Sequence, residues 1–538
     1  MKFPALTFFI LSIVIILVFE KLPQTFYQQD EWHGLGLTLG EGINSIFHGV
    51  SSPWDFLFVK GRILASFTYF LFATYLPLEN APLAFLAIAL HIIATFLVFV
   101  LIRKFIKNNI VSLLGAIFFA VNGVSHGGVT WPAIAINAVT STILVLLAVL
   151  SFFKYFKFAR SRWLFLTGLL IYLSLWFRET GFYLFLLLPL SAFLLKRYSA
   201  ISFLKTYWVF LLAFLSIVFY RVIDLYSTTT KANLYLTGQN ENFISTIALR
   251  SVLYPLTSFS LMFVPGDQFL GFARAVLRQI YPFFASSPQN ILIAQTIILD
   301  LLATILTLFI ILSLILLMQK KKTANKKIVF FWLAFTFMSF LPYVLLSKDF
   351  AYLESRYYYL SVVGGAVLLA WVLKRLWEIL GFRIFYLTVL PLCIFYIIFH
   401  ASVVKGAIAE QVRLSNIRKD FMVQLKTLVP TLDNKKNLFY ITSDLNYWAD
   451  GNKIPFQQGS GFTFMILYNE SGKIPKILLR DEFLSEIGSQ GYREVGEYGF
   501  GYFWEREKLE EAVKHYNLPE GSIIKLEYNS NLGQLKKI

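Results

Sequence analysis

The sequence is poor in cysteine and in charged residues. Cys393 is the only cysteine among 538 residues, so no disulfide can form within the chain. Charged residues make up 15% of the sequence, whereas a soluble domain carries about 25%. Hydrophobic residues make up 57%, which is more apolar surface than a soluble core of this size could bury. Lipid must therefore act as solvent for much of the chain, which excludes an ordinary soluble protein.

Long apolar runs dominate residues 1–404. They predict an all-α polytopic membrane domain of about eleven transmembrane helices. The first run carries no small-residue cleavage pattern after it, so we expect an uncleaved signal anchor. The runs lie at 3–19, 83–102, 110–124, 133–153, 163–177, 182–195, 207–220, 291–318, 328–346, 357–373 and 384–399.

Lysine and arginine cluster in alternate gaps between these runs, where Glu378 is the only acidic residue. This asymmetry is typical of cytoplasmic loops. It predicts a multi-pass protein, of a bacterial plasma membrane, with a cytoplasmic N-terminus and an extracytoplasmic C-terminal domain. The net charge of +17 therefore indicates membrane orientation and not nucleic-acid binding. The clusters are Arg103, Lys104 and Lys107; Lys154, Lys157, Arg160 and Arg162; Lys196, Arg197 and Lys205; Lys320, Lys321, Lys322, Lys326 and Lys327; Lys374, Arg375 and Arg383.

Two semi-apolar segments lie in gaps on the other side of the membrane from the basic clusters. An odd number of membrane crossings by these segments would break the alternation of the basic gaps. Within the extracytoplasmic first loop, 21–82, we expect residues 61–77 to form a helix along the outer surface. Residues 243–264 either lie on that surface or form one arm of a re-entrant pair, and the path through 290 is left open.

The tail, residues 405–538, is predicted to be a small extracytoplasmic α/β domain. We expect a helix leaving the membrane at 406–428 and another at 508–516. Alternating or continuous apolar runs bounded by glycine predict strands. These strands are expected at 437–443, 462–468, 500–505 and 522–528.

Acidic residues just after the first apolar run are candidates for catalysis. Asp30 and Glu31 stand beside aromatic residues close to the expected membrane surface. A carboxylate there can act as general base toward an acceptor hydroxyl. The alternative is a solvated loop carboxylate.

Three arginines on the expected outer side are candidates for binding a phosphate. Arg178 interrupts an apolar stretch, and adjacent Glu179 could fix its orientation. Arg356 begins a span and Arg62 begins the surface helix. The alternatives are a local ion pair at 178–179, interfacial anchoring at Arg356 and a lipid head-group contact at Arg62. Tyr357, next to Arg356, and His126, in the outer segment 122–132, are added as supporting residues.

Other polar residues have structural explanations. Asp300, inside a span, needs a partner, for which Arg250 and Arg356 are candidates. His91 is expected to form a hydrogen bond between helices. His33, His126 and Asp30 lack the tight spacing of a metal site, so we expect no cofactor, with a divalent metal ion kept as an alternative.

Several short motifs occur in a fixed order along residues 1–400. They are Asp30-Glu31; Arg62-Ile63-Leu64-Ala65-Ser66-Phe67; His91; Leu101-Ile102-Arg103-Lys104; Gly115-Ala116-Ile117-Phe118-Phe119-Ala120-Val121-Asn122; Trp131; Trp176-Phe177-Arg178-Glu179-Thr180-Gly181; and Ser355-Arg356-Tyr357-Tyr358-Tyr359-Leu360. This order resembles the GT-C superfamily of membrane glycosyltransferases, in particular its protein O-mannosyltransferase-like branch.

The resemblance implies an inverting transfer of a sugar from a polyprenyl-phosphate carrier, with Asp30 as base and Glu31 as the second acid of the pair. Arg178 stands where the family often has lysine. Arg62 is followed by Ile63 where the family usually has proline, and Ser355 separates Glu354 from Arg356. The second acid of some relatives falls near Asn137, so a two-carboxylate mechanism is not indicated.

The expected partners are a polyprenyl-phosphate-linked sugar donor, a protein, lipid or glycan acceptor, and membrane lipids, without nucleic acid. Two other functions stay open. A polysaccharide ligase or polymerase would use a longer lipid-linked glycan. A lipid or glycan transporter would be expected to have inverted repeats and broken helices that meet in mid-bilayer.

Overall fold

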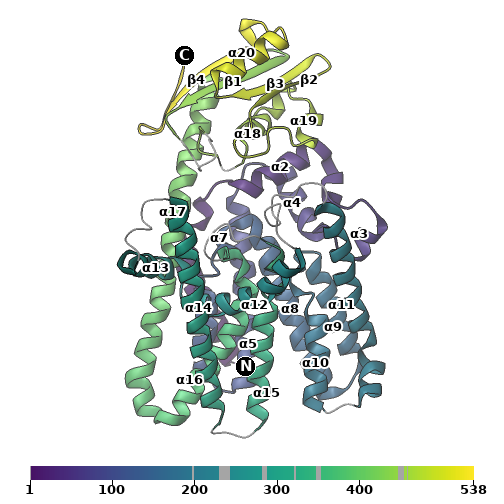
Figure 1. Ribbon diagram of the computed structural model, residues 1–538, viewed down its shortest axis with the longest axis vertical. Coiled ribbons are helices and arrows are strands. Elements are labelled where there is room, and N and C mark those ends of the chain that lie inside the picture. Colours follow the sequence, from purple (N-terminus) through teal and green to yellow (C-terminus); the bar gives the residue numbers. More distant parts are fainter. Residues whose placement is uncertain are drawn as a thin grey trace. The chain divides into compact units, whose positions relative to one another are not determined.

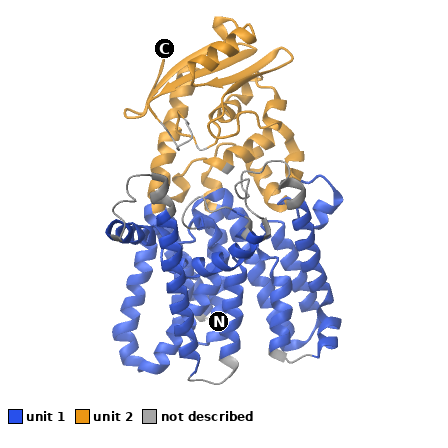
Figure 2. Cartoon of the chain, viewed as in Figure 1, with its two compact units in different colours: residues 1–20, 50–62, 86–406 blue, residues 21–49, 63–85, 407–538 orange. Residues whose placement is uncertain are grey.

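The computed structural model describes residues 2–196, 199–229, 243–280, 288–319, 323–346, 353–445, 453–456 and 458–538. The chain divides into two compact units (Figure 2). Unit 1 comprises residues 1–20, 50–62 and 86–406. Unit 2 comprises residues 21–49, 63–85 and 407–538.

Before the sheet, the regular elements among the described residues are helices, joined by turns (Figure 1). The shorter elements that matter below are the 3-10 helices η2 (Gly42–Phe47), η3 (Glu179–Gly181), η5 (Leu341–Leu345) and η6 (Ser355–Tyr357). The α-helices are α1 (Lys2–Phe19), α2 (Gln29–Glu41), α3 (Pro53–Leu57), α4 (Ile63–Tyr75), α5 (Ala81–Ile106), α6 (Asn109–Ala120), α7 (Gly127–Thr130), α8 (Pro132–Phe158), α9 (Ser161–Leu175), α10 (Leu184–Lys196), α11 (Ala200–Thr229), α12 (Phe243–Leu261), α13 (Gly266–Ile280), α14 (Pro288–Gln319), α15 (Thr323–Met338), α16 (Tyr359–Ile384) and α17 (Leu390–Leu428).

Among the described residues, seven helical segments are long and apolar enough to cross a membrane, or up to eight if a bent pair counts as one span. The chain is therefore an integral multi-pass membrane protein, but the expectation of about eleven spans is met only in part. Helices α6, α9 and α10 have 12, 15 and 13 residues. At about 1.5 Å per residue they are shorter than a hydrocarbon core about 30 Å thick. The runs 357–373 and 384–399 both fall in one apolar segment, Tyr359–Leu428.

The bent pair lies where the sequence left two paths open. Helices α12 and α13 meet at an angle of 100° across a short break, which fits a broken span or a re-entrant loop. The break is held inside unit 1: Asn122 Nδ2 donates to the Met262 carbonyl at 3.1 Å, and Tyr396 and His400 Nε2 both reach the Phe263 carbonyl. Satisfied carbonyls of this kind allow non-helical backbone at membrane depth.

Unit 2 contains a five-stranded mixed sheet in the order β2-β3-β1-β4-β5. The central strand β1 runs parallel to β3 and β4, with Leu438 opposite both Gly501 and Ile523. The two edge strands pair antiparallel. The bounds are β1 (Lys436–Ser443), β2 (Gly491–Val495), β3 (Tyr498–Phe503), β4 (Ile523–Asn529) and β5 (Gln534–Lys537), with helices α18 (Ser460–Leu467), α19 (Lys476–Arg480) and α20 (Arg506–His515).

Three of the four predicted strands and both predicted tail helices are confirmed, as β1, β3, β4, α17 and α20. The strand expected at 462–468 is wrong, because those residues form the buried helix α18. A run of apolar residues that is buried on every side has no periodicity that separates a strand from a helix.

The first-loop segments and the tail of unit 2 share one hydrophobic core. Phe26, Trp32 and Leu35 lie in the same buried cluster as Phe421 and Phe462. The backbone N–H of Phe26 donates to Ser415 Oγ at 2.9 Å, which ties the start of the loop to α17. The region after the first helix is therefore packed into the core of unit 2 and is not a solvated loop.

Candidate functional site

The three candidate arginines all belong to unit 1, and each sits beside a helix end. Arg62 immediately precedes α4, in the turn that follows α3. Arg178 is the N-cap of η3, directly after α9. Arg356 lies in η6, directly before α16. Helix ends interrupt the apolar runs at these points, which is why charged side chains can occur there.

Arg62 and Glu179 form an ion pair across the site. The distance from Arg62 Nε to Glu179 Oε2 is 3.1 Å, and Nη2 lies 3.5 Å from Oε1. The two side chains are 45% and 41% exposed. The positive charges of Arg62 and Arg221 both act on the Glu179 carboxylate. Arg62 is thus oriented by Glu179 while its side chain stays partly exposed.

Arg178 is the most enclosed of the three arginines, with 7% of its surface exposed. Its Nη1 donates to the Arg356 carbonyl at 3.2 Å. Its guanidinium lies over the rings of Tyr343 and Tyr357, at 5.8 and 5.5 Å from their centroids. Cation–π contacts and a hydrogen bond therefore fix the Arg178 side chain in one orientation.

Arg356 is also held between aromatic rings and an acid. Its guanidinium lies 4.9 Å from the Trp131 ring centroid and 5.2 Å from that of Tyr357. Arg356 Nε lies 2.7 Å from Glu354 Oε2. The glutamate that is displaced by one position in the sequence thus still pairs with this arginine. The predicted supporting residue Tyr357 contacts both Arg178 and Arg356.

The inserted Ser355 has a packing partner in α7. A Cβ atom placed on Gly127 would lie 2.1 Å from Ser355 Oγ and 3.2 Å from the Arg356 backbone nitrogen. Only glycine allows the two segments to approach this closely. The position of Arg356 therefore depends on the absence of a side chain at Gly127.

His126 precedes α7 and makes a local contact. Its Nδ1 lies 3.1 Å from Thr130 Oγ1. Burial lowers the pKa of His126 to about 4, and the opposing effect of Asp267 does not restore it. The imidazole is neutral at pH 7, so His126 can orient neighbours and cannot add positive charge to the arginines.

The two acids expected to catalyse belong to unit 2, at the start of α2. Glu31 is 3% exposed and its Oε2 accepts a hydrogen bond from the backbone N–H of Gln28 at 3.3 Å, as part of a capping box. The structure thus gives Glu31 a helix-capping role. The Asp30 side chain lies outside the described residues. Its convergence with the arginines, which belong to the other unit, stays a prediction.

His91 and Arg250 both make hydrogen bonds to other segments of the chain. His91 is confirmed as an interhelical hydrogen-bonding residue: Nδ1 lies 2.7 Å from the Tyr359 hydroxyl and Nε2 lies 2.8 Å from the Ala120 carbonyl. Arg250 donates to the Leu346 carbonyl at 3.2 Å. The expected pairing of Asp300 with Arg250 or Arg356 stays a prediction.

Sequence reasoning missed Tyr343, and it named Trp131 only as a motif residue, without its contact to Arg356. Both are aromatic residues in or beside apolar runs, where rings are common, and nothing in the pattern shows that they cover arginines. Across the residues that the structure describes, no group of three or more histidine, cysteine or acidic side chains could hold a metal ion.

Known protein-family models give no match to the chain, and neither do the curated proteins.

Proposed function

We propose that the protein is a glycosyltransferase that moves a sugar from a polyprenyl-phosphate carrier to an acceptor hydroxyl on the outer face of a membrane. The observation that carries this proposal is the arginine cluster of unit 1. Arg62, Arg178 and Arg356 come from distant parts of the chain and are linked through Glu179 and Tyr357. Arginine recognises phosphate oxygens in a bidentate way, which suits the head group of such a donor.

The chemistry needs a base and a stabilised leaving group. The acceptor oxygen would attack the anomeric carbon and form the new glycosidic bond. The bond between that carbon and the carrier phosphate oxygen would break, and its electron pair would leave with the phosphate. Asp30 would take the acceptor proton, and the arginines would stabilise the phosphate charge.

The membrane-embedded helices suit a donor with a long isoprenoid tail, because the tail can stay in lipid while its head group reaches the arginines. The proposed orientation has a cytoplasmic N-terminus and an extracytoplasmic tail, in a bacterial plasma membrane. It rests on the lysine and arginine clusters in alternate gaps.

The test is transfer from a radiolabelled polyprenyl-phosphate monosaccharide, with purified full-length protein and acceptors supplied by a membrane extract. Asp30→Asn should keep expression and melting temperature but lose transfer. Arg356→Ala should raise the KM for the donor. The matched control is Arg506→Ala, an exposed tail arginine, which should change neither. Undiminished transfer by Asp30→Asn would exclude the proposed base.

One observation favours a second function, that of a transporter for a lipid-linked glycan. The 100° break between α12 and α13 is of the kind found at the substrate sites of transporters. The two functions differ in what they need. An enzyme cleaves its donor in detergent, whereas a transporter leaves the donor intact and needs two compartments. A ligase or polymerase would fail with the monosaccharide carrier and act on a longer glycan.

A further inference from the structure

The segment that leads to Arg62 contains an unfavourable backbone conformation. Helix α3 ends with Val59 at φ 58°, in the left-handed region. The Lys60 N–H donates to the Asp55 carbonyl at 2.7 Å and the Val59 N–H to the Phe56 carbonyl at 3.3 Å, the pattern of a Schellman helix end. Glycine normally occupies that position, and a β-branched residue is disfavoured there. Surrounding contacts must hold this turn in place.

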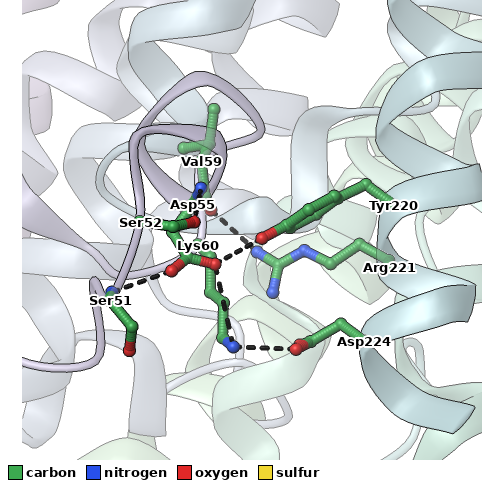
Figure 3. Close-up of polar contacts among 8 residues, drawn as sticks. All are labelled: Ser51, Ser52, Asp55, Val59, Lys60, Tyr220, Arg221 and Asp224. Carbon is green, nitrogen blue, oxygen red and sulfur yellow. Dashed lines mark hydrogen bonds and ion pairs between the residues drawn. The ribbon is translucent and has the colours of Figure 1, made fainter. Parts of the chain in front are cut away.

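Three residues within one turn of α11 supply those contacts (Figure 3). The Tyr220 hydroxyl donates to the Asp55 carboxylate. Arg221 Nη2 donates to the carbonyl of Val59 at 2.8 Å, which is the residue with the unfavourable φ. Lys60 Nζ donates to Asp224 Oδ1 at 2.7 Å. We call Tyr220, Arg221 and Asp224 the α11 clamp.

The charged groups that contact the α11 clamp, Asp55 and Lys60, are partly or largely buried. Burial alone would raise the pKa of Asp55, but hydrogen bonds from Tyr220, Ser51 and Ser52 lower it. The hydrogen bond to Asp224 raises the pKa of Lys60. The Lys60 and Asp224 side chains are 30% and 22% exposed. Lys60 therefore keeps its positive charge at neutral pH, and water screens this ion pair incompletely.

The turn is also anchored on its other side. The Tyr172 hydroxyl donates to the Leu57 carbonyl at 3.2 Å, and the Phe56 ring packs edge-on against Trp176 at 4.5 Å. Both partners lie at the end of α9, two to six residues before Arg178. The chain from α3 to Lys60 is thus held between α9 and α11, and only Gly61 separates it from Arg62.

We infer that the α11 clamp is a positioning device for Arg62: it holds the Val59–Lys60 turn so that the Arg62 guanidinium meets Glu179 in the orientation from which it would contact the donor phosphate. The inference rests on the proposed function for the identity of the ligand. The clamp residues would not touch the donor. They would act through Arg62, and Asp224 is the member whose charge can be exchanged with that of its partner.

The test uses the full-length protein in detergent and reads Arg62 directly. Four variants are compared: Asp224→Asn, Lys60→Met, the exchanged pair Lys60→Asp with Asp224→Lys, and Glu20→Gln as matched control. Glu20 forms an ion pair with Lys405 at 3.8 Å, with both side chains about half exposed, in the same unit. The rate at which phenylglyoxal modifies Arg62 is followed by peptide mass spectrometry.

Asp224→Asn and Lys60→Met should raise the modification rate of Arg62 about tenfold, because the guanidinium leaves Glu179 more often. They should raise the KM for the lipid-linked donor by a similar factor with a smaller change in kcat. The exchanged pair should restore both values at least in part, and Glu20→Gln should change neither. A purely structural clamp would lower the melting temperature and leave Arg62 reactivity and KM unchanged, which would overturn the inference.

The reactivity readout separates this inference from the proposed function. If the wild type transfers no sugar while Arg62 reactivity still follows the clamp variants, the clamp stands and the proposed function fails. If the wild type transfers sugar and Arg62 reactivity is the same in all variants, the clamp inference fails and the proposed function stands.

Discussion

Arg178 donates a hydrogen bond from Nη1 to the main-chain carbonyl of Arg356, 3.2 Å away and 178 residues later in the sequence. The contact joins the end of α9 to the turn before α16. It fixes the backbone of the second arginine through the side chain of the first. The two residues therefore form one unit, in which Arg178 sets the place from which Arg356 acts.

Arg178→Lys tests this relationship. Lysine keeps the charge but cannot both reach the carbonyl and lie flat on the two tyrosine rings. Loss of a hydrogen bond at a buried site costs about 1–3 kcal/mol. We expect a lower melting temperature in detergent and a donor KM raised about tenfold, since about 1.4 kcal/mol corresponds to one factor of ten. Arg160→Lys, at an exposed position, serves as control. Equal KM values for wild type and Arg178→Lys would contradict the coupling.

Gly127→Ala tests the close approach of α7 to η6. The added methyl group would overlap Ser355 Oγ, so the turn that carries Arg356 must shift. Overpacking of this kind costs about 1–3 kcal/mol. We expect a lower melting temperature and weaker donor binding, measured by titration with a polyprenyl phosphate.

Gly406→Ala is the matched control for that change. Gly406 lies within α17, and a Cβ placed there meets nothing within 4 Å. Alanine is favoured over glycine inside a helix by about 1 kcal/mol, so stability should stay equal or rise. The contrast fails if both substitutions weaken donor binding to the same extent.

His126→Asn tests the pH dependence of stability. The folded-state pKa of about 4 lies below the ordinary value of 6.5, so between these values the unfolded chain binds a proton that the folded protein does not. Acidification from pH 6.5 to 4 therefore favours unfolding, by no more than about 2 kcal/mol for this partly exposed group. Asparagine keeps a polar contact to Thr130 and does not titrate. The difference in unfolding free energy between variant and wild type, from denaturant titrations, should grow as the pH falls and then level off below pH 4. A constant difference across that range would be the contrary outcome.

The amount of fold that could be predicted from the sequence differs between the two units. Hydropathy located the apolar helices, but it could not measure their length: α6 and α10 are too short to span a bilayer straight. In the tail, strands β1 and β4 carry clear strand signals. Residues 462–468 read as a strand because they form a short, mostly apolar run that follows Gly461, and only tertiary packing makes them a helix.

The candidate site could be predicted as a set of residues and not as a set of contacts. Charges that interrupt or begin apolar segments pointed to Arg62, Arg178 and Arg356. Their pairing could not be foreseen, since Arg62 and Glu179 lie 117 residues apart. The α11 clamp was missed for a related reason: Asp224 stands at the end of an apolar run, where a single acid gives no sign of a partner 164 residues earlier.

The shared core of unit 2 leads to a last prediction. Phe462 of α18 is fully buried, and its ring lies so close to α2 that a Cβ on Gly36 would approach it to 2.3 Å. Removing such a ring from a core costs about 3–5 kcal/mol. Phe462→Ala should therefore destabilise the tail and the first-loop segment 21–49 together, because both pack around the same side chain.

Limited proteolysis of the purified full-length protein reads this coupling. In Phe462→Ala, cleavage should increase within 21–49 as well as within the tail, whereas in Leu532→Ala, at a position 66% exposed, neither region should change. If the two segments were separate folding units, cleavage in Phe462→Ala would rise in the tail alone. The first loop holds Asp30, so joint unfolding would also remove transfer activity without any change to the proposed base. A loss of activity in core variants of the tail must therefore be read together with the proteolysis of residues 21–49.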